Sequence, residues 1–251
     1  MASQIATGAP PAVAQLGALQ REFRPSQAAV IIVLVVIGVL ALIFAIGTTG
    51  SSSDGGGFAV GLVICLLLAL GVILLSVFLP RKSVVQHERG LAVYRRKELV
   101  AVVPWDRIAH VTQAITRTYT NGVHTNTSYR YSIQTVEGRS FTFTNGLRHV
   151  KDLGVRIQEA TFPIILARSQ AAFNTGQPIQ FGKLSLSQAG MQSGSSSILW
   201  SEVSGAQVSR GTIYIKKSGR RRSWASQQVA RTPDFLVLIT LVNNLSGQRA
   251  N

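Results

Sequence analysis

Two long apolar runs separate the beginning of the chain from a region in which short apolar and polar segments alternate. The runs, Ala28–Ile46 and Phe58–Leu79, contain no charged residue and are joined by the Gly- and Ser-rich loop Gly47–Gly57. A helix needs about 20 mostly apolar residues to cross a bilayer, so each run predicts a membrane-spanning helix. We therefore expect a transmembrane helical hairpin over residues 28–79.

The residues beside the two runs predict how this hairpin is oriented. The flanks are basic, with Arg21, Arg24, Arg81 and Lys82, whereas the loop between the runs carries one acid, Asp54. Because cytoplasmic segments carry the excess of Lys and Arg, both ends of the chain are expected on the cytoplasmic side. The predicted location is the cell inner (cytoplasmic) membrane, with two spans.

The first 27 residues show no sustained helical or strand period and are rich in Ala, Gln, Gly and Pro. This composition predicts a flexible tail over residues 1–27. A cleaved signal peptide is the alternative, because two arginines precede an apolar run. The run is longer than the roughly 7–15 residues of a signal sequence, and a second run follows, which favours the retained tail.

Small residues recur along one face of each apolar run. They are Gly38, Ala41 and Ala45 in the first run, and Gly57, which directly precedes the second run, with Gly61, Cys65 and Ala69 inside it. In lipid, close approach at small residues is a main source of helix association. The two faces are expected to pack against each other, with a dimer interface as the alternative. Neither run has an ionisable side chain, which argues against a proton or ion pathway.

From Ser83 onward, short runs of β-branched and aromatic residues alternate with turn residues. The predicted strands are Leu91–Tyr94, Leu99–Val103, Ile108–Thr116, Tyr129–Val136 and Ser140–Thr144. Asn121-Gly122 and Glu137-Gly138 predict hairpin turns, because Gly accepts the positive φ that such turns require. The segment is therefore expected to form antiparallel sheet.

A helix is predicted after these strands. Val150, Leu153 and Ile157 recur at helical spacing, and the pattern continues to a stop near Gly176. Pro163 is expected to kink or split this helix, because proline removes a backbone donor. The strands and the helix together predict a first unit over residues 83–175.

The remaining chain repeats this plan in a shorter form. Gly90-Leu91, Trp105 and Ile108 of the first copy correspond to Gly190-Met191, Trp200 and Val203 of the second. The second copy, residues 177–246, closes with a helix for which Thr232 is the expected N-cap and Pro233 the first position. Fewer strands are recognisable here, so this copy either forms a small sheet or completes a shared one.

This plan of strands followed by a closing helix, with a Trp between central strands, resembles the pleckstrin-homology-like (PH-like) domains of bacterial membrane proteins. The patterns around Trp105, Phe181-Gly182-Lys183-Leu184 and Trp200, and the Pro233 helix, resemble a bacterial family known only as a domain of unknown function. The resemblance implies tandem small barrels capped by helices, used for binding lipids or proteins. It assigns no functional residue.

Charge adds one candidate binding site. The chain has a net charge of +15, which favours an anionic partner. The positive residues Lys216, Lys217, Arg220, Arg221 and Arg222 surround a Gly turn between two strands. By analogy with PH domains, this turn is a candidate for binding anionic lipid headgroups, and a solvated hairpin is the alternative. Nucleic acid is not expected as a partner, because the chain has no nucleic-acid motif.

The residues that usually carry catalysis or metals form no pattern. His87, His110, His124 and His149 lack metal-ligand spacing, and the single cysteine, Cys65, excludes an intramolecular disulfide. No catalytic residue, metal or cofactor is therefore predicted. A pocket that gathered His with Asp or Glu would instead favour an enzyme.

These patterns together predict a membrane hairpin followed by all-β or α+β PH-like units. The expected function is a non-catalytic binding or scaffold protein. Its expected partners are membrane lipids with anionic headgroups, and another protein or a second copy of this chain. Lipid sensing through Lys216–Arg222 and an enzyme with a dispersed site are the alternatives.

Overall fold

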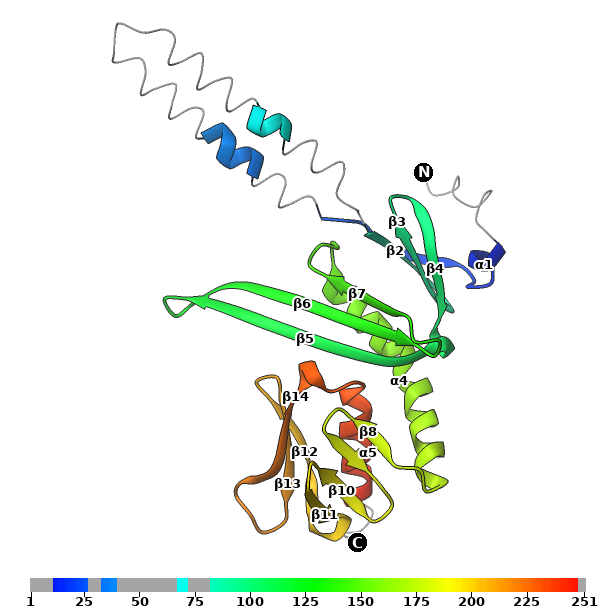
Figure 1. Ribbon diagram of the computed structural model, residues 1–251, viewed down its shortest axis with the longest axis vertical. Coiled ribbons are helices and arrows are strands. Elements are labelled where there is room, and N and C mark those ends of the chain that lie inside the picture. The colour runs from blue at the N-terminus through cyan, green and yellow to red at the C-terminus, as the bar shows by residue number, and fades with distance from the viewer. Residues whose placement is uncertain (1–10, 27–32, 40–66, 72–81, 248–251) are drawn as a thin grey trace, which may run out of the picture.

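The computed structural model describes residues 11–26, 33–39, 67–71 and 82–247. These residues form four antiparallel sheets, arranged as two successive units (Figure 1). Unit 1 consists of residues 19–23 and 82–174, and unit 2 consists of residues 179–247. Each unit has a four-stranded sheet, a three-stranded sheet and a closing helix, in that order along the chain.

The first sheet of unit 1 includes a strand from before the apolar runs. Its order is β1 (Leu19–Phe23), β2 (Lys82–His87), β3 (Gly90–Arg95) and β4 (Glu98–Pro104). Phe23 is buried on one face, and Leu16, which follows the short helix α1 (Pro11–Ala14), is buried on the other. The prediction of a flexible tail is wrong for residues 11–26, because these residues supply both a strand and apolar side chains to the fold.

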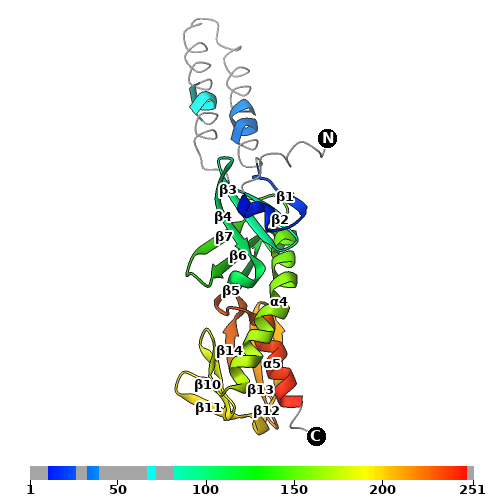
Figure 2. The same ribbon diagram turned by 90° about the vertical axis from the view of Figure 1, so that its right-hand side faces the viewer.

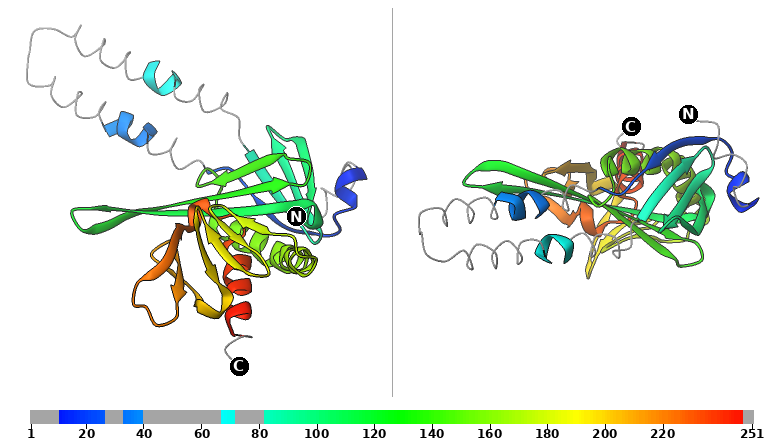
Figure 3. Two further views of the ribbon diagram at one scale, coloured as in Figure 1. Left: turned by 60° about the horizontal axis from the view of Figure 1, so that its bottom comes forward. Right: turned by 90° about the horizontal axis from the view of Figure 1, so that it is seen from above.

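The second sheet of unit 1 contains a hairpin much longer than the rest of its sheet. β5 (Ile108–Thr120) pairs along its length with β6 (Val123–Thr135), whereas β7 (Ser140–Thr144) covers only Arg130–Gln134 of β6. The outer part of this hairpin, residues 114–129, is called the arm below, and it extends away from both units (Figures 1 and 3). The turn at Asn121-Gly122 is confirmed, and both residues have positive φ.

The closing helix of unit 1, α4 (Val150–Asn174), also contacts unit 2. It packs against β5 and β6 and, further along, against the first strand and the closing helix of unit 2 (Figure 2). Leu153 and Ile157 are fully buried at its start, as the helical spacing predicts. Pro163 lies inside one continuous helix, so the predicted split does not occur.

Unit 2 has a complete set of short strands. Its four-stranded sheet consists of β8 (Ile179–Phe181), β9 (Leu184–Leu186), β10 (Gly190–Ser193) and β11 (Ser196–Leu199). Its three-stranded sheet consists of β12 (Val203–Ser209), β13 (Thr212–Lys217) and β14 (Ser223–Gln228). Within the described residues this copy therefore pairs its own strands and shares no sheet with unit 1.

The closing helix of unit 2, α5 (Phe235–Gly247), starts later than its expected cap. The hydroxyl of Thr232 donates to the carbonyl oxygen of Gln228 and accepts from the side chain of Gln227. Asp234 stands immediately before the helix, and its carbonyl oxygen accepts the N–H of Leu238. Thr232 therefore closes the preceding turn, and the N-cap prediction is wrong.

The repeated tryptophans occupy equivalent places in the two units. Trp105 begins a short 3-10 helix after β4, and Trp200 begins one after β11. The Trp105 indole N–H donates to the carbonyl oxygen of Glu88 at 2.9 Å, and that of Trp200 to Ser187 at 2.8 Å. Each indole thus ties the end of a four-stranded sheet to an earlier turn of the same unit.

Most of the buried apolar side chains of the two units form one connected core, and Ala92 packs in a smaller cluster with Val13 and Leu16. The connected core extends from Phe23 and Val84 in unit 1 through Ile165 of α4 to Phe181 and Trp200 in unit 2. Apolar burial is the dominant favourable term in folding, so the two units are expected to unfold together.

Helices in the apolar runs are described only in part. Helical residues are seen at 33–39 and 67–71, and across the described ranges no helix combines the length and apolar character needed to cross a membrane. A crossing takes about 20 residues. This finding overturns the predicted transmembrane hairpin over 28–79 and the two-span inner-membrane location, and the fold is mostly β. The rest of both runs lies outside the described residues.

Candidate functional site

The β13–β14 turn gathers the five predicted anion-binding cations. Lys216 and Lys217 end β13, and Arg220, Arg221 and Arg222 follow Gly219, whose φ of +71° the turn requires. The three arginines are exposed. Within the described residues, neither Arg221 nor Arg222 has a carboxylate close enough to form an ion pair.

The two lysines of this turn are held in contacts within unit 2. Lys217 Nζ donates to Glu202 Oε1 at 2.6 Å, and this hydrogen bond lowers the pKa of the Glu202 carboxyl. Lys216 Nζ lies 6.0 Å from the centre of the Tyr214 ring, within reach of a cation–π contact. The turn also lies on the other side of the arm from β2 (Figure 1). Fewer cations are thus free for a ligand than the sequence suggests.

A second group of polar residues joins unit 1 to unit 2. Asp234, just before α5, presents its two carboxylate oxygens to β5: Oδ1 accepts the backbone N–H of Val111 at 2.7 Å, and Oδ2 lies 2.6 Å from His110 Nδ1. The N–H of Asp234 donates to the carbonyl oxygen of Val111 at 2.8 Å. One residue of unit 2 therefore binds the edge of β5 through three hydrogen bonds.

The electrostatics of this pair follow from its burial. The Asp234 side chain is 3% exposed, whereas the His110 side chain is 49% exposed. The hydrogen bond to Asp234 raises the pKa of His110, against the opposing effects of partial burial and of the charge on Arg168. The carboxylate therefore favours the protonated imidazole.

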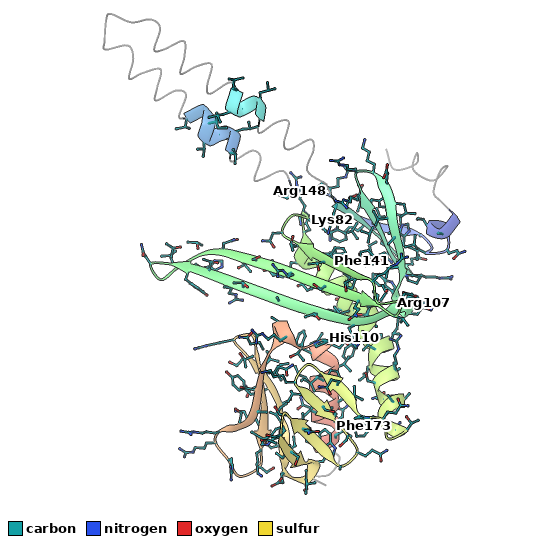
Figure 4. The ribbon with its side chains drawn as sticks, in the orientation of Figure 1. Lys82, Arg107, His110, Phe141, Arg148 and Phe173 are labelled. Atoms are coloured by element: carbon teal, nitrogen blue, oxygen red, sulfur yellow. The ribbon has the colours of Figure 1, made fainter. Side chains whose placement is uncertain are left out.

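A cleft of about 640 Å³ opens beside this pair, between the two units. His110 and Arg107, both labelled in Figure 4, lie on its unit 1 side. Arg168 of α4 donates to the carbonyl oxygens of Ile108 at 3.3 Å and Asp106 at 3.0 Å, so its guanidinium is held at the wall. The cleft thus brings a histidine together with two acids, Asp106 and Asp234.

A cleft that gathers a histidine with acids would favour an enzyme. Its buried acid, Asp234, however, has a structural role. Both oxygens of Asp234 are used in docking unit 2 onto β5. Ser169 also lines the cleft, yet among the described residues no hydrogen bond joins it to His110. His110 can accept a proton, but nothing described beside it is arranged as an activated nucleophile.

The other predicted site residues are separated from these groups. Gly38 is exposed and Ala69 partly exposed, whereas Ala41, Ala45, Gly57, Gly61 and Cys65 lie outside the described residues. In the part of the chain that the structure describes, no three His, Cys, Asp or Glu side chains are grouped to hold a metal.

Sequence reasoning missed the His110–Asp234 pair. The two residues are 124 positions apart, and neither belongs to a spaced motif. The available signal was Asp234 itself, an acid directly before a strongly apolar helix, because such a position often satisfies backbone donors. The backbone N–H that donates to Asp234 belongs to Val111 on β5 and not to a residue of α5.

Comparison with known families covers nearly the whole chain. Residues 7–250 match a family of unknown function, DUF6585. The chain belongs to this family. Comparisons with curated proteins and with solved structures give no match. Membership in DUF6585 agrees with the expected domain of unknown function, and it assigns no activity, ligand or partner.

Proposed function

We propose that this DUF6585 protein is a non-catalytic binding protein whose two units are PH-like and whose arm docks an extended, acidic segment of a partner protein. The order of a four-stranded sheet, a three-stranded sheet and a closing helix in both units supports the PH-like assignment. The arm is the observation on which the docking proposal rests.

The arm presents unpaired strand edges. β5 is the outer strand of its sheet, and β7 pairs with β6 only as far as Arg130. An exposed edge offers a row of backbone N–H and C=O groups to which an extended peptide can add as a further strand. On β6, the side chain of Asn145 bonds the N–H of Tyr129 and the carbonyl oxygen of Thr127, so the edge of β5 is the freer one.

The side chains of the arm fit such a partner. Ile115, Tyr119 and Val123 are 45%, 58% and 65% exposed. The sheet to which they belong therefore leaves much of their apolar surface uncovered. No acid occurs between Asp106 and Glu137, whereas Arg117 lies on the arm and Arg130 directly follows it. Apolar anchors with a positive background favour an acidic segment with alternating apolar residues.

The docking proposal is tested by site-specific photo-cross-linking of the full chain in its native cell extract. A photoreactive residue at Tyr119 is expected to capture a discrete protein species. The same residue at Arg210, in the short β12–β13 turn of unit 2, serves as the matched control and should not capture it. Deleting residues 115–119 and 124–129 shortens the arm around its turn and should abolish capture by a photoreactive residue at Thr120.

Two results would contradict this docking site. One is capture of the same species from Tyr119 and Arg210, which would show general proximity. The other is retention of the partner by Arg117→Glu and by the shortened chain, provided that both keep the far-ultraviolet circular dichroism of the wild type.

A further inference from the structure

A small basic pocket lies at the end of unit 1 where the described chain stops at Ser26 and resumes at Lys82. Its volume is about 380 Å³. It is lined by Pro25, Ser26, Lys82, Thr142, Phe143, Thr144, Gly146 and Leu147. This set is called the collar pocket below, and none of its described lining residues is acidic.

The wall of the collar pocket is fixed by backbone contacts. The N–H of Ser26 donates to the carbonyl oxygen of Gly146 at 2.7 Å, and Pro25 forms a β-bridge with Leu147. The N–H of Arg148 donates to the carbonyl oxygen of Arg24 at 2.9 Å. The segment after β1 is therefore held against the turn that leads from β7 to α4.

Basic residues adjoin the lining of the pocket. Lys82 pairs in register with Arg95, and Arg148 follows the lining residue Leu147; Figure 4 shows Lys82 and Arg148 at the same end of unit 1. All three side chains are exposed, and no described carboxylate forms an ion pair with any of them. Arg24 is different, because it is paired with Glu22 at 2.9 Å.

These groups suit a phosphate. Lysine and arginine bind phosphate through charge-assisted hydrogen bonds, and the Thr144 hydroxyl on the pocket wall is a further donor. The chain on both sides of the pocket continues into the uncharged apolar runs 28–46 and 58–79. In the sequence, the lining residues Ser26 and Lys82 thus flank an apolar segment, a pattern that suits a ligand with both a phosphate and an apolar part.

We propose that the collar pocket binds the phosphate of an anionic phospholipid headgroup. The site goes beyond the docking function of the arm, because it is lined by residues of β2 and β7 and of the segments beside them and by none of the arm. It also differs from the β13–β14 turn, which belongs to unit 2. The proposal needs no membrane-spanning helix, since all the ligating groups lie on described residues.

The test uses the full chain and short-chain lipids below their micelle concentration, so that bilayer partitioning does not contribute. Dihexanoyl phosphatidic acid is expected to bind, measured by isothermal titration calorimetry, and dihexanoyl phosphatidylcholine to bind much more weakly. Lys82→Gln and Arg148→Gln should each weaken binding about fivefold, and the double variant about 25-fold. Lys82→Arg and Arg148→Lys should restore most of the affinity.

Matched variants exclude a general effect of charge. Lys183→Gln with Arg210→Gln removes two exposed cations from unit 2 and should leave affinity unchanged. An equal loss in this control, or a loss confined to Arg220→Gln, Arg221→Gln and Arg222→Gln, would overturn the site. Binding of inorganic phosphate as tightly as phosphatidic acid would overturn the lipid assignment, as would absence of binding by either probe.

Discussion

Unit 1 and unit 2 share their inner framework and differ at their outer parts. In both, a glycine at the start of a strand pairs with the residue before the tryptophan: Gly90 with Pro104, and Gly190 with Leu199. A Cβ at Gly90 would lie 2.8 Å from Pro104 Cα, and one at Gly190 would lie 3.0 Å from Leu199 Cα. The repeat in the sequence thus preserves a close approach of strands.

The differences lie where ligands are proposed. Unit 1 takes its first strand from before the apolar runs and extends β5 and β6 into the arm, whereas β12 and β13 of unit 2 end in a short turn. The two units therefore share the order of their sheets and closing helix, and they differ in the length of their strands and in where the first strand comes from. Unit 1 is the more specialised copy, and its additions carry both proposed binding sites.

The largest expected effects come from removing the two tryptophans. Trp200→Ala should lower the free energy of unfolding by about 3–5 kcal/mol, and Trp105→Ala by less. Trp200 is 1% exposed and meets the Phe173 ring edge-on at 6.4 Å, whereas Trp105 is 7% exposed. Chemical denaturation followed by circular dichroism measures both. A second, separate transition in either variant would show that the units do not unfold together.

Removing the connection between the units should have the next largest effect. Asp234→Ala leaves the buried Val111 N–H without its acceptor and places alanine at a φ of +51°. The expected loss of unfolding free energy is about 2–4 kcal/mol. Asp234→Asn keeps the acceptor and tolerates this φ, so it should lose about 1 kcal/mol. Equal losses in the two variants would contradict the geometry described for Oδ1.

The smallest expected effect is a pH dependence of stability carried by His110. Its pKa is raised in the folded chain by Asp234, so the protonated form contributes stability below the unfolded pKa of about 6.5. This contribution is lost as the pH rises through the folded pKa. Because the side chain is half exposed, it should stay below about 1 kcal/mol. His110→Gln should remove it from urea denaturation curves, and an unchanged pH profile would disprove it.

Local patterns predicted much of unit 1. Tyr129–Val136 was predicted as a strand, in which the structure buries Tyr131, Ile133 and Thr135, and Asn121-Gly122 was predicted as the turn before it. Local patterns failed where partners are distant: β1 pairs with β2 across the apolar runs, and Leu19–Phe23 shows no clear period. Unit 2 was underestimated because its strands β10 and β11 are only four residues long, and β10 begins with a glycine, a residue that is depleted in strands.

Asp234 illustrates the same limit at a site. Its position before an apolar helix suggests a capping role, but its partners lie on β5 of the other unit. A hydrogen bond between units depends on how they are placed, and that placement follows from the shared core around α4. The apolar runs show a different limit. Their composition alone predicted membrane-spanning helices, and the described residues contain no helix long and apolar enough to cross a membrane.

Unit 1 is completed by β1, a strand that comes from a distant part of the sequence, before the apolar runs. A fragment that begins at Ser83 lacks Phe23, which is 1% exposed in the core, and leaves the edge of β2 open. We expect such a fragment to bind a peptide of residues 11–26, because this peptide contains the missing strand and Phe23. Association of the two pieces would then report completion of unit 1.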